Sequence, residues 1–466
     1  MMKTIMEPKS TIVKLWSVPK KTEEQSYRLM DYILRNECED GTLLYNVVTS
    51  EMVLLDPSFD LDSIVPGAYD PAMDELIQHH FVVPADYDEK KSVDQLRVIM
   101  RKLNKPKRIS GYTIYPTTCC NARCFYCFEN NFVKETMTEE TAEAVVKYIA
   151  EHCGGKGIEI TWFGGEPLVG RHIIDYICKR LNEREIPFQS SMVSNAYLFD
   201  AEVAKTAVDL WKLKNVQITL DGTEEVYNAT KAYQGVTGSP YQRVLDNIDL
   251  VLEAGIGVAV RLNVTPENVE NLFLLADELR TRFISKKGLQ VYSHIVYDEV
   301  GYDPVEYTDE SKEHLFEQMI YLQDKLIQNH LSRGVHEMPS FKEIRCMADN
   351  DGCVTIFPDG KLGKCENSSQ DNTFADIYGN EFPGKCQDCK KYRSYERCTH
   401  CQLYPECIHL AVCPDQGVCT ELQASAKIDA YCTLLLKKYN MMISPNKPRS
   451  ELIPYNSYTQ VCDTKM

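Results

Sequence analysis

Four cysteines stand within nine residues of this chain, just after a short apolar run. Cys120, Cys124 and Cys127 give the spacing C-x3-C-x2-C, and Cys119 precedes them. Three thiolates on one short loop can hold three irons of a [4Fe–4S] cube and leave the fourth iron open to a chelating small molecule. The alternative, a zinc knuckle, needs a fourth ligand nearby. The spacing therefore predicts an iron–sulfur site in which Cys119 is a spectator.

A second field of cysteines lies toward the C-terminus. Eleven of the 19 cysteines fall between Cys346 and Cys432. Residues 1–16 contain no uninterrupted apolar stretch of the kind found in a secretory signal, so a disulfide scaffold is not expected. Thiols gathered in this way indicate a metal, either zinc or iron–sulfur. We expect this loop-rich segment to need a metal scaffold, because it buries too little apolar surface to offset its chain entropy.

Composition excludes several classes of protein. The chain has 466 residues, of which 44% are hydrophobic, so two to four domains with a sizeable core are expected. Its 51 Lys and Arg against 68 Asp and Glu give a formal net charge of −17, which argues against a nucleic-acid-binding surface. No run approaches the roughly 18 apolar residues of a membrane span. The sequence therefore predicts a soluble, cytoplasmic protein.

The cysteine loop follows the first of a series of strands that alternate with helices. The expected strands are Tyr112–Tyr115, Ile158–Phe163, Phe188–Val193, Val216–Leu220, Val258–Val264 and Leu289–Val296. The expected helices between them are Thr138–His152, Arg171–Asn182, Ala201–Leu213, Tyr241–Ala254 and Glu267–Phe283. This alternation is typical of parallel βα units with right-handed crossovers. Six units are fewer than the eight of a closed barrel, so we predict a partial, TIM-like (β/α)6 barrel with its site at the carboxyl ends of the strands.

The first hundred residues are expected to form a small α+β module that is separate from the rest. Its expected elements are a helix over Thr22–Asn36, a hairpin of Thr42–Val48 and Met52–Leu55, and a helix over Pro71–His80, followed by a connecting helix over Lys90–Asn104. The predicted regions are the module at 1–104, the partial barrel at 105–310, a linker helix at 311–345, the cysteine-rich domain at 346–440 and a tail at 441–466.

The loop resembles that of a known family. C-x3-C-x-aromatic-C after a first strand is similar to the radical S-adenosylmethionine (SAM) superfamily, and Gly164-Gly165-Glu166-Pro167 resembles its GGEP motif. The glycines let the backbone come close to the amino group of methionine; an ordinary βα turn is the alternative reading. The resemblance implies a [4Fe–4S] cluster whose open iron binds SAM. It also implies reductive cleavage of SAM to methionine and a 5′-deoxyadenosyl radical that abstracts hydrogen.

Weaker matches follow in the family's order. Ser194-Asn195-Ala196 stands where the family often has Asn-Gly, Thr219-Leu220-Asp221-Gly222 resembles I-S-L-D-G, and Arg261 with Asn263 resembles V-R-x-N. Lys231 stands where relatives often carry an arginine that meets the SAM carboxylate, which keeps the charge but not the bidentate fork. Each match alone is equally an ordinary strand-end polar residue. The cofactor-binding residues that the resemblance implies are Tyr126, Gly164, Gly165, Glu166, Asn195, Thr219, Lys231 and Arg261.

The C-terminal cysteines resemble the SPASM domain, which carries auxiliary [4Fe–4S] clusters in radical SAM enzymes that act on peptides and proteins. The resemblance implies two such clusters. One would use Cys346, Cys353, Cys365 and Cys413, and the other Cys398, Cys401, Cys407 and Cys432. The match departs from the family at Ala411, where a cysteine is expected, and it leaves Cys386, Cys389 and Cys419 without a role. Zinc ribbons are the alternative for any CxxC pair.

The N-terminal module resembles the winged-helix leader-recognition element of peptide-modifying relatives, in which a leader peptide adds a strand to a β-hairpin; a structural cap is the alternative. The leading hypothesis is a maturase of a ribosomally made precursor peptide that forms a cysteine thioether or another carbon-centred crosslink, with a flavodoxin or ferredoxin as reductant. The alternatives are a sulfatase-maturating type of enzyme that makes formylglycine, and a non-enzymatic iron–sulfur carrier or zinc-bound interaction protein. No catalytic residue is assigned, and His294 is expected to be structural.

Overall fold

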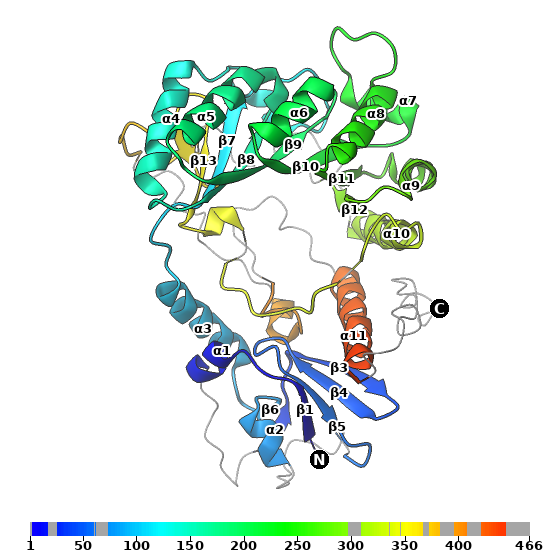
Figure 1. Cartoon of the computed structure of the whole chain (residues 1–466). Coiled ribbons are helices and arrows are strands. Elements are labelled where there is room, and N and C mark those ends of the chain that lie inside the picture. The colour runs from blue at the N-terminus through cyan, green and yellow to red at the C-terminus, as the bar shows by residue number, and fades with distance from the viewer. Residues whose placement is uncertain are drawn as a thin grey trace.

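The structure is a computed structural model of the chain. It describes residues 2–16, 26–59, 61, 73–296, 309–334, 336–344, 346–366, 372–382, 396–407 and 421–443. Figure 1 shows two lobes, with the βα units in one and the N-terminal residues in the other. Among the described helices, none combines the length and apolar character that crossing a membrane requires.

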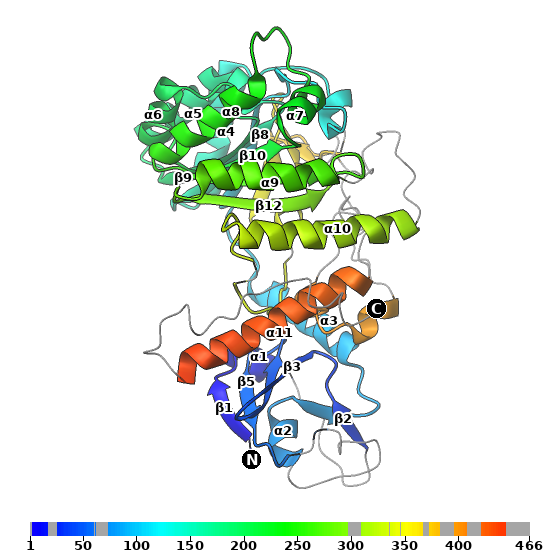
Figure 2. The same ribbon diagram turned by 90° about the vertical axis from the view of Figure 1, so that its right-hand side faces the viewer.

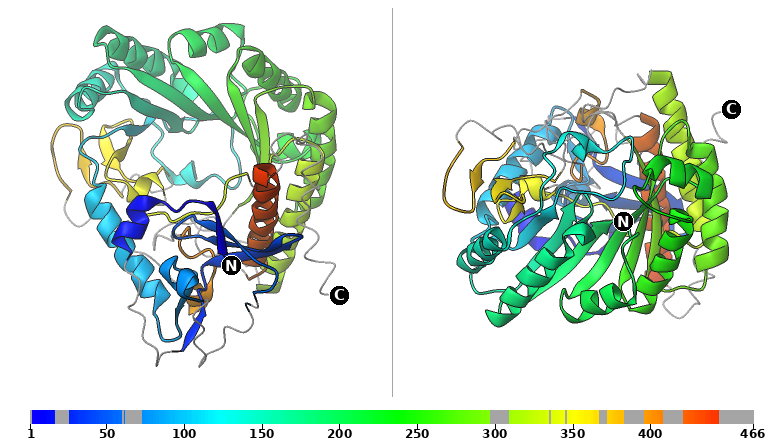
Figure 3. Two further views of the ribbon diagram at one scale, coloured as in Figure 1. Left: turned by 60° about the horizontal axis from the view of Figure 1, so that its bottom comes forward. Right: turned by 90° about the horizontal axis from the view of Figure 1, so that it is seen from above.

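Six parallel strands form the centre of the larger lobe, and all six were predicted. They are β7 (Gly111–Thr117), β8 (Ile158–Gly164), β9 (Phe188–Ser194), β10 (Leu213–Leu220), β11 (Gly257–Val264) and β12 (Leu289–Ile295). Each pairs in parallel with the next along the chain, which confirms the partial (β/α)6 barrel. The covering helices are α4 (Glu139–His152), α5 (Arg171–Glu183), α6 (Ala201–Asp209), α7 (Glu224–Lys231), α8 (Pro240–Glu253) and α9 (Val269–Phe283). They lie along one face of the curved sheet (Figure 3).

Local sequence explains where these helices begin. Thr138, Asp200 and Ser239 precede α4, α6 and α8, and each side chain accepts a hydrogen bond from the backbone N–H three residues on. Such caps satisfy N–H groups that have no partner within the helix. Alternate residues along each strand then pack against the helices, as Val258, Val260 and Leu262 do in the main core.

The sheet extends beyond β7 into the cysteine-rich region. Strand β13 (Cys353–Ile356) pairs in parallel with β7, and β14 (Lys361–Gly363) and β15 (Ala375–Asp376) continue the sheet in antiparallel fashion. This part of the region does not build a core of its own but joins the main core, in which Val354 and Ile356 are buried. Helix α10 (Asp309–Gln328) lies in the first part of the stretch expected to be a linker helix, 311–345, and ends before the rest of it.

The N-terminal lobe contains a four-stranded sheet in the order β1-β5-β4-β3. Its strands are β1 (Met2–Met6), β3 (Ile33–Cys38), β4 (Gly41–Asn46) and β5 (Met52–Leu55), and the β4–β5 pair is the predicted hairpin. The helix predicted over Thr22–Asn36 is wrong, because β2 (Tyr27–Leu29) pairs with β6 (Val82–Pro84) and β3 follows it. Apolar residues three or four apart also fit two short buried strands, so the period was ambiguous. The remaining helices are α1 (Ser10–Leu15), α2 (Asp74–Gln78) and α3 (Glu89–Leu103).

The N-terminal residues are not a separate module. Helix α11 (Glu421–Ile443) lies across β3 and β4 (Figure 2), and its Tyr431 and Leu435 share a buried core with Leu34 and Leu43. The expected boundary at residue 440 therefore falls inside a helix. The sequence alone did not reveal this helix, because the strands that it packs on lie some 400 residues earlier in the chain. Asn36 and Cys432, for example, are in contact although 396 residues separate them.

Candidate active site

The loops that follow β7, β8, β9 and β10 converge on one cavity of about 200 Å³. Its lining residues include Cys120, Cys124, Cys127, Gly164, Gly165, Ser194, Asn195, Thr219 and Lys231. The residues predicted separately from the sequence are thus brought together at the carboxyl ends of the strands, the usual position of a site in parallel βα folds. The described lining does not include Cys119, Tyr126, Glu166 or Arg261.

The two glycines allow direct contact between the first two loops. A Cβ atom on Gly165 would lie 2.5 Å from the carbonyl oxygen of Cys119, and one on Gly164 would lie 2.2 Å from that of Thr117. Gly164 also has a φ of +117°, which favours glycine. The backbone N–H of Glu166 donates to Cys119 at 3.0 Å. Glycine at these positions therefore lets the cysteine loop rest on the end of β8.

Glu166 connects the second loop with the third. Its Oε1 accepts hydrogen bonds from the Ser194 hydroxyl at 2.9 Å and from Leu168 N–H at 3.1 Å, and its Oε2 accepts one from Asn195 N–H at 2.8 Å. Burial raises the pKa of Glu166 to about 7, although the hydrogen bonds from Asn195, Leu168 and Ser194 act in the opposite direction. Glu166 acts here as a positioning residue for the strand ends.

Asn121 and Arg123, two residues inside the cysteine motif to which the sequence analysis gave no role, connect the cysteine loop with the third and fourth loops. The Asn195 amide donates to Asn121 Oδ1 at 2.7 Å, and Arg123 N–H donates to the carbonyl of Lys231 at 2.8 Å. Arg123 also lines the cavity, and its guanidinium donates to Cys120 O at 2.7 Å. These are the variable positions of the motif, so its spacing gave no signal for them.

Lys231 ends α7 and is buried against Asp221. Its Nζ lies 3.0 Å from Asp221 Oδ2 and donates to the Tyr126 hydroxyl at 3.0 Å, and that hydroxyl donates to Asp221 Oδ1 at 2.6 Å. Burial would lower the pKa of Lys231, but the charges of Asp221 and Cys124 raise it well above the usual value. The Lys231 ammonium group therefore lies at the cavity already paired with the Asp221 carboxylate.

The thiols of the loop suit a positively charged cofactor. Burial raises the pKa of Cys120 to about 12 and of Cys127 to about 11, so their thiolates need a nearby cation. Within the described ranges, no three His, Cys, Asp or Glu side chains are close enough to hold a single metal ion. Three thiols around one cavity fit the separate corners of an iron–sulfur cluster, in which each iron takes its own cysteine.

The C-terminal cysteines fall into two places. Cys346 and Cys353 lie near each other at β13, and Cys365 follows β14 at the same edge of the large sheet. Cys398 and Cys401 pack in the N-terminal lobe, where Cys432 of α11 also lies. Cys407 belongs to the same described segment, 396–407. Cys386, Cys389, Cys413 and Cys419 lie outside the described residues.

His294 and Arg261 lie on the inner face of the sheet. Arg261 Nη2 is 2.8 Å from His294 Nδ1, and Arg261 Nε donates to Asn263 Oδ1 at 3.0 Å. His294 is half-buried rather than enclosed in the core.

The fold and the site together define an α/β enzyme built on a partial barrel with a thiol-rich cavity. Residues 114–279 match the family model described as the radical SAM superfamily. This stretch of the chain therefore contains a radical SAM domain, which supports an enzyme, and its fold implies SAM and a [4Fe–4S] cluster. The match to this domain favours an enzyme over the non-enzymatic alternative.

Among curated relatives, the chain is 29% identical over 162 residues to a probable GTP 3′,8-cyclase of Archaeoglobus fulgidus, which covers 34% of this chain and 49% of the relative. The chain thus spans about half the length of the curated relatives it matches. A solved structure of anSMEcpe with bound AdoMet and Cp18Cys peptide superposes with a TM-score of 0.52 at 15% identity, covering 71% of this chain and 99% of that one. Streptococcus suis SuiB bound to precursor peptide SuiA gives a TM-score of 0.47 at 15% identity, with coverage of 82% and 94%.

Proposed function

We propose that this enzyme is a peptide maturase that modifies a ribosomally synthesised precursor peptide through radical chemistry, most directly by forming a cysteine thioether or another carbon-centred crosslink. The observation that carries the proposal is the single cavity shared by Cys120, Cys124, Cys127 and the two glycines of the second loop. The cavity supports the proposal because the cysteine loop and the backbone of Gly164 and Gly165 lie side by side in its lining.

Within this proposal, Cys120, Cys124 and Cys127 hold the cluster, and Gly164 and Gly165 offer backbone to the methionine part of SAM. When bound, the cluster and SAM supply a 5′-deoxyadenosyl radical. Asn195 and Thr219, which follow or end the next two strands, line the cavity. Glu166 accepts a hydrogen bond from Asn195, and Tyr126 donates one to Asp221, so both support the lining without being part of it. Lys231 supplies a cation to the cavity, although Asp221 shares its charge.

Two auxiliary [4Fe–4S] clusters belong to the proposal, and the two cysteine sets are its support. Cys346, Cys353 and Cys365 lie at one edge of the barrel sheet, and Cys413 would complete them. Cys398, Cys401, Cys407 and Cys432 belong to the segments packed on the N-terminal lobe. A cluster in each lobe would allow one to serve the substrate and the other to relay electrons from a flavodoxin or ferredoxin.

The N-terminal sheet is the proposed docking place for the leader of the precursor peptide. One edge, at β3, is covered, because the Gln402 side chain donates to Ile33 O at 2.8 Å and the Asn36 side chain donates to Cys432 O at 2.7 Å. The other edge, at β1, has no strand paired beyond it among the described residues. Strand addition at β1 would therefore leave the covered edge intact.

The test is anaerobic incubation of iron-reconstituted enzyme with SAM, dithionite and the peptide encoded by a neighbouring short reading frame, followed by mass spectrometry. We expect 5′-deoxyadenosine and a loss of two hydrogens per modified residue. Conversion of a cysteine or serine to formylglycine would favour the sulfatase-maturating alternative. Purified protein that contains zinc and no iron, or that releases no 5′-deoxyadenosine, would refute the proposal.

A further inference from the structure

Arg261 lies on β11, next to the cavity but not in its lining. Strands β10 and β11 are paired so that Arg261 is the partner of Thr219, which lines the cavity. Residues paired across neighbouring strands point to the same face of the sheet. Asn263 and His294 are likewise partners across β11 and β12. Arg261 therefore faces the interior of the partial barrel, one strand away from the proposed SAM site.

The surroundings of this arginine are polar and carry no compensating anion. Its guanidinium contacts the Asn263 amide oxygen and the His294 ring, and in the described part of the chain no carboxylate forms an ion pair with it. The neighbouring strands present Gln217 and Tyr292, whose side chains bond to each other at 2.8 Å. Partial burial makes an uncompensated guanidinium charge costly, so an anion bound beside Arg261 would be stabilising.

The ring of His294 contacts the Arg261 guanidinium from the neighbouring strand. Its Nδ1 lies 2.8 Å from Arg261 Nη2, a donor, and 2.7 Å from the carbonyl oxygen of Ile295, an acceptor. A ring nitrogen can serve only one of them, since it either accepts or donates. If Nδ1 carries the proton for Ile295, the guanidinium has to turn to another acceptor. A carboxylate placed beside Arg261 would provide that acceptor.

From this arrangement, and resting on the proposed function, we propose that Arg261 binds the carboxylate of an Asp or Glu side chain of the peptide substrate, and that His294 is its positioning residue. SAM also has a carboxylate, but Arg123 and Lys231 already line the cavity where SAM is proposed to bind, and Arg261 does not. A guanidinium is suited to a carboxylate because its fork donates two parallel hydrogen bonds. The site would thus select acidic peptides despite a chain charge of −17.

Peptide capture tests this selection without turnover. The probes are two pools of synthetic ten-residue peptides with amidated C-termini. Each peptide contains one cysteine, eight positions that are random over the residues other than Asp and Glu, and a fixed residue that is Glu in one pool and Gln in the other. Iron-reconstituted enzyme with SAM and no reductant is immobilised, and retained peptides are counted by mass spectrometry. We expect the wild type to retain Glu peptides about tenfold over Gln peptides, and Arg261→Gln to lose this preference. Arg333→Gln, which removes an exposed arginine, should keep it.

A parallel measurement of the SAM dissociation constant separates the two sources of carboxylate. An unchanged constant in Arg261→Gln together with lost peptide preference supports the proposal. A constant raised about tenfold with peptide preference intact would assign the site to SAM and overturn it, as would the absence of both effects. His294→Asn, which keeps an acceptor at the Nδ1 position, should retain the preference, and His294→Leu should weaken it severalfold; equal behaviour would remove the role of His294. Failure of SAM cleavage would count against the proposed function alone, because capture requires no reaction.

Discussion

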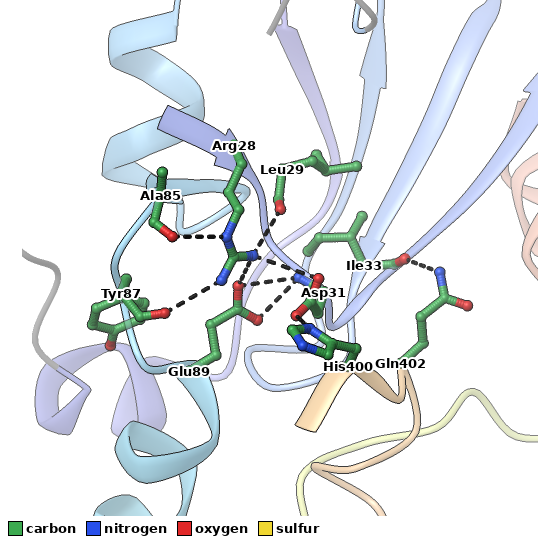
Figure 4. A network of polar contacts seen from close by, with 9 residues as sticks. All are labelled: Arg28, Leu29, Asp31, Ile33, Ala85, Tyr87, Glu89, His400 and Gln402. Carbon is green, nitrogen blue, oxygen red and sulfur yellow. Dashed lines mark hydrogen bonds and ion pairs between the residues drawn. The ribbon is translucent and has the colours of Figure 1, made fainter. Parts of the chain in front are cut away.

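His400 Nδ1 lies 2.7 Å from Asp31 Oδ2, although 369 residues separate the two in sequence. Figure 4 shows the network around this contact: the Asp31 N–H donates to both oxygens of Glu89, Arg28 pairs with Glu89, and Gln402 reaches Ile33. The segment that carries Cys398, Cys401 and Cys407 is therefore attached to the N-terminal lobe. Leader docking and one proposed auxiliary cluster would act within a single folded unit.

Because α11 and the N-terminal strands share a core, we expect a substitution in α11 to destabilise those strands. Leu435 is fully buried between α11 and β3–β4, so Leu435→Ala should destabilise the lobe by about 2–5 kcal/mol. Hydrogen–deuterium exchange should rise in peptides from β3 and β4 and stay unchanged in β8–β10. Met442→Ala, on an exposed turn of the same helix, should change exchange little. Equal protection of β3 and β4 in both variants would show that the lobe is stable without α11.

The network around Glu89 predicts a pH dependence. Burial raises the pKa of Glu89 from its ordinary value of 4.5 to about 7, against the lowering effect of Arg28. Between pH 4.5 and 7, Glu89 is therefore protonated in the folded state but ionised in the unfolded state. Stability contributed by this group is full below pH 4.5 and is lost as pH rises toward 7, at up to about 1.4 kcal/mol per pH unit.

Glu89→Gln, which cannot titrate, isolates this contribution from those of other buried carboxyl groups. The free energy of unfolding of the N-terminal lobe, followed by exchange in β2 and β6, should fall more steeply with pH between 4.5 and 7 in the wild type than in the variant. Parallel pH profiles for the two proteins would contradict the shifted pKa.

Features that depend on residues close together in the sequence could be predicted, whereas contacts between residues far apart in the sequence could not. The six barrel strands and the cysteine loop were predictable, because alternating βα periods and motif order are local signals. The pairing of Asn36 with Cys432 was not, because no local pattern records a contact between the two ends of the chain. Nor did the motif show that Asp221 neutralises Lys231, since only the folded loops bring them together.

The contact between the first two loops predicts a strong effect of a single methyl group. Gly165→Ala would place Cβ within 2.6 Å of the carbonyl oxygens of both Cys119 and Thr118, so the cysteine loop has to move. We expect a loss of most iron from the loop, measured as iron content and visible absorbance in a background where the C-terminal cysteines are replaced. Gly157→Ala, whose Cβ would meet only Pro187 at 3.6 Å or more, should bind iron normally. Normal iron content in Gly165→Ala would show that the loop adapts to the added methyl.

The buried pair of Lys231 and Asp221 predicts strong coupling between the two residues. Lys231→Met leaves the Asp221 carboxylate buried with the Tyr126 hydroxyl as its remaining donor among the described residues, which should cost about 3–5 kcal/mol. The double variant Asp221→Asn/Lys231→Met removes both charges, so it should recover much of that loss and give a coupling energy of about 2 kcal/mol or more. Urea unfolding can be followed through Trp162 and Trp211, both buried in the barrel core, with the same cycle repeated for SAM binding. Additive losses in the cycle would mean that the two charges do not interact, and Lys231 would then be free to meet the SAM carboxylate as the sequence first suggested.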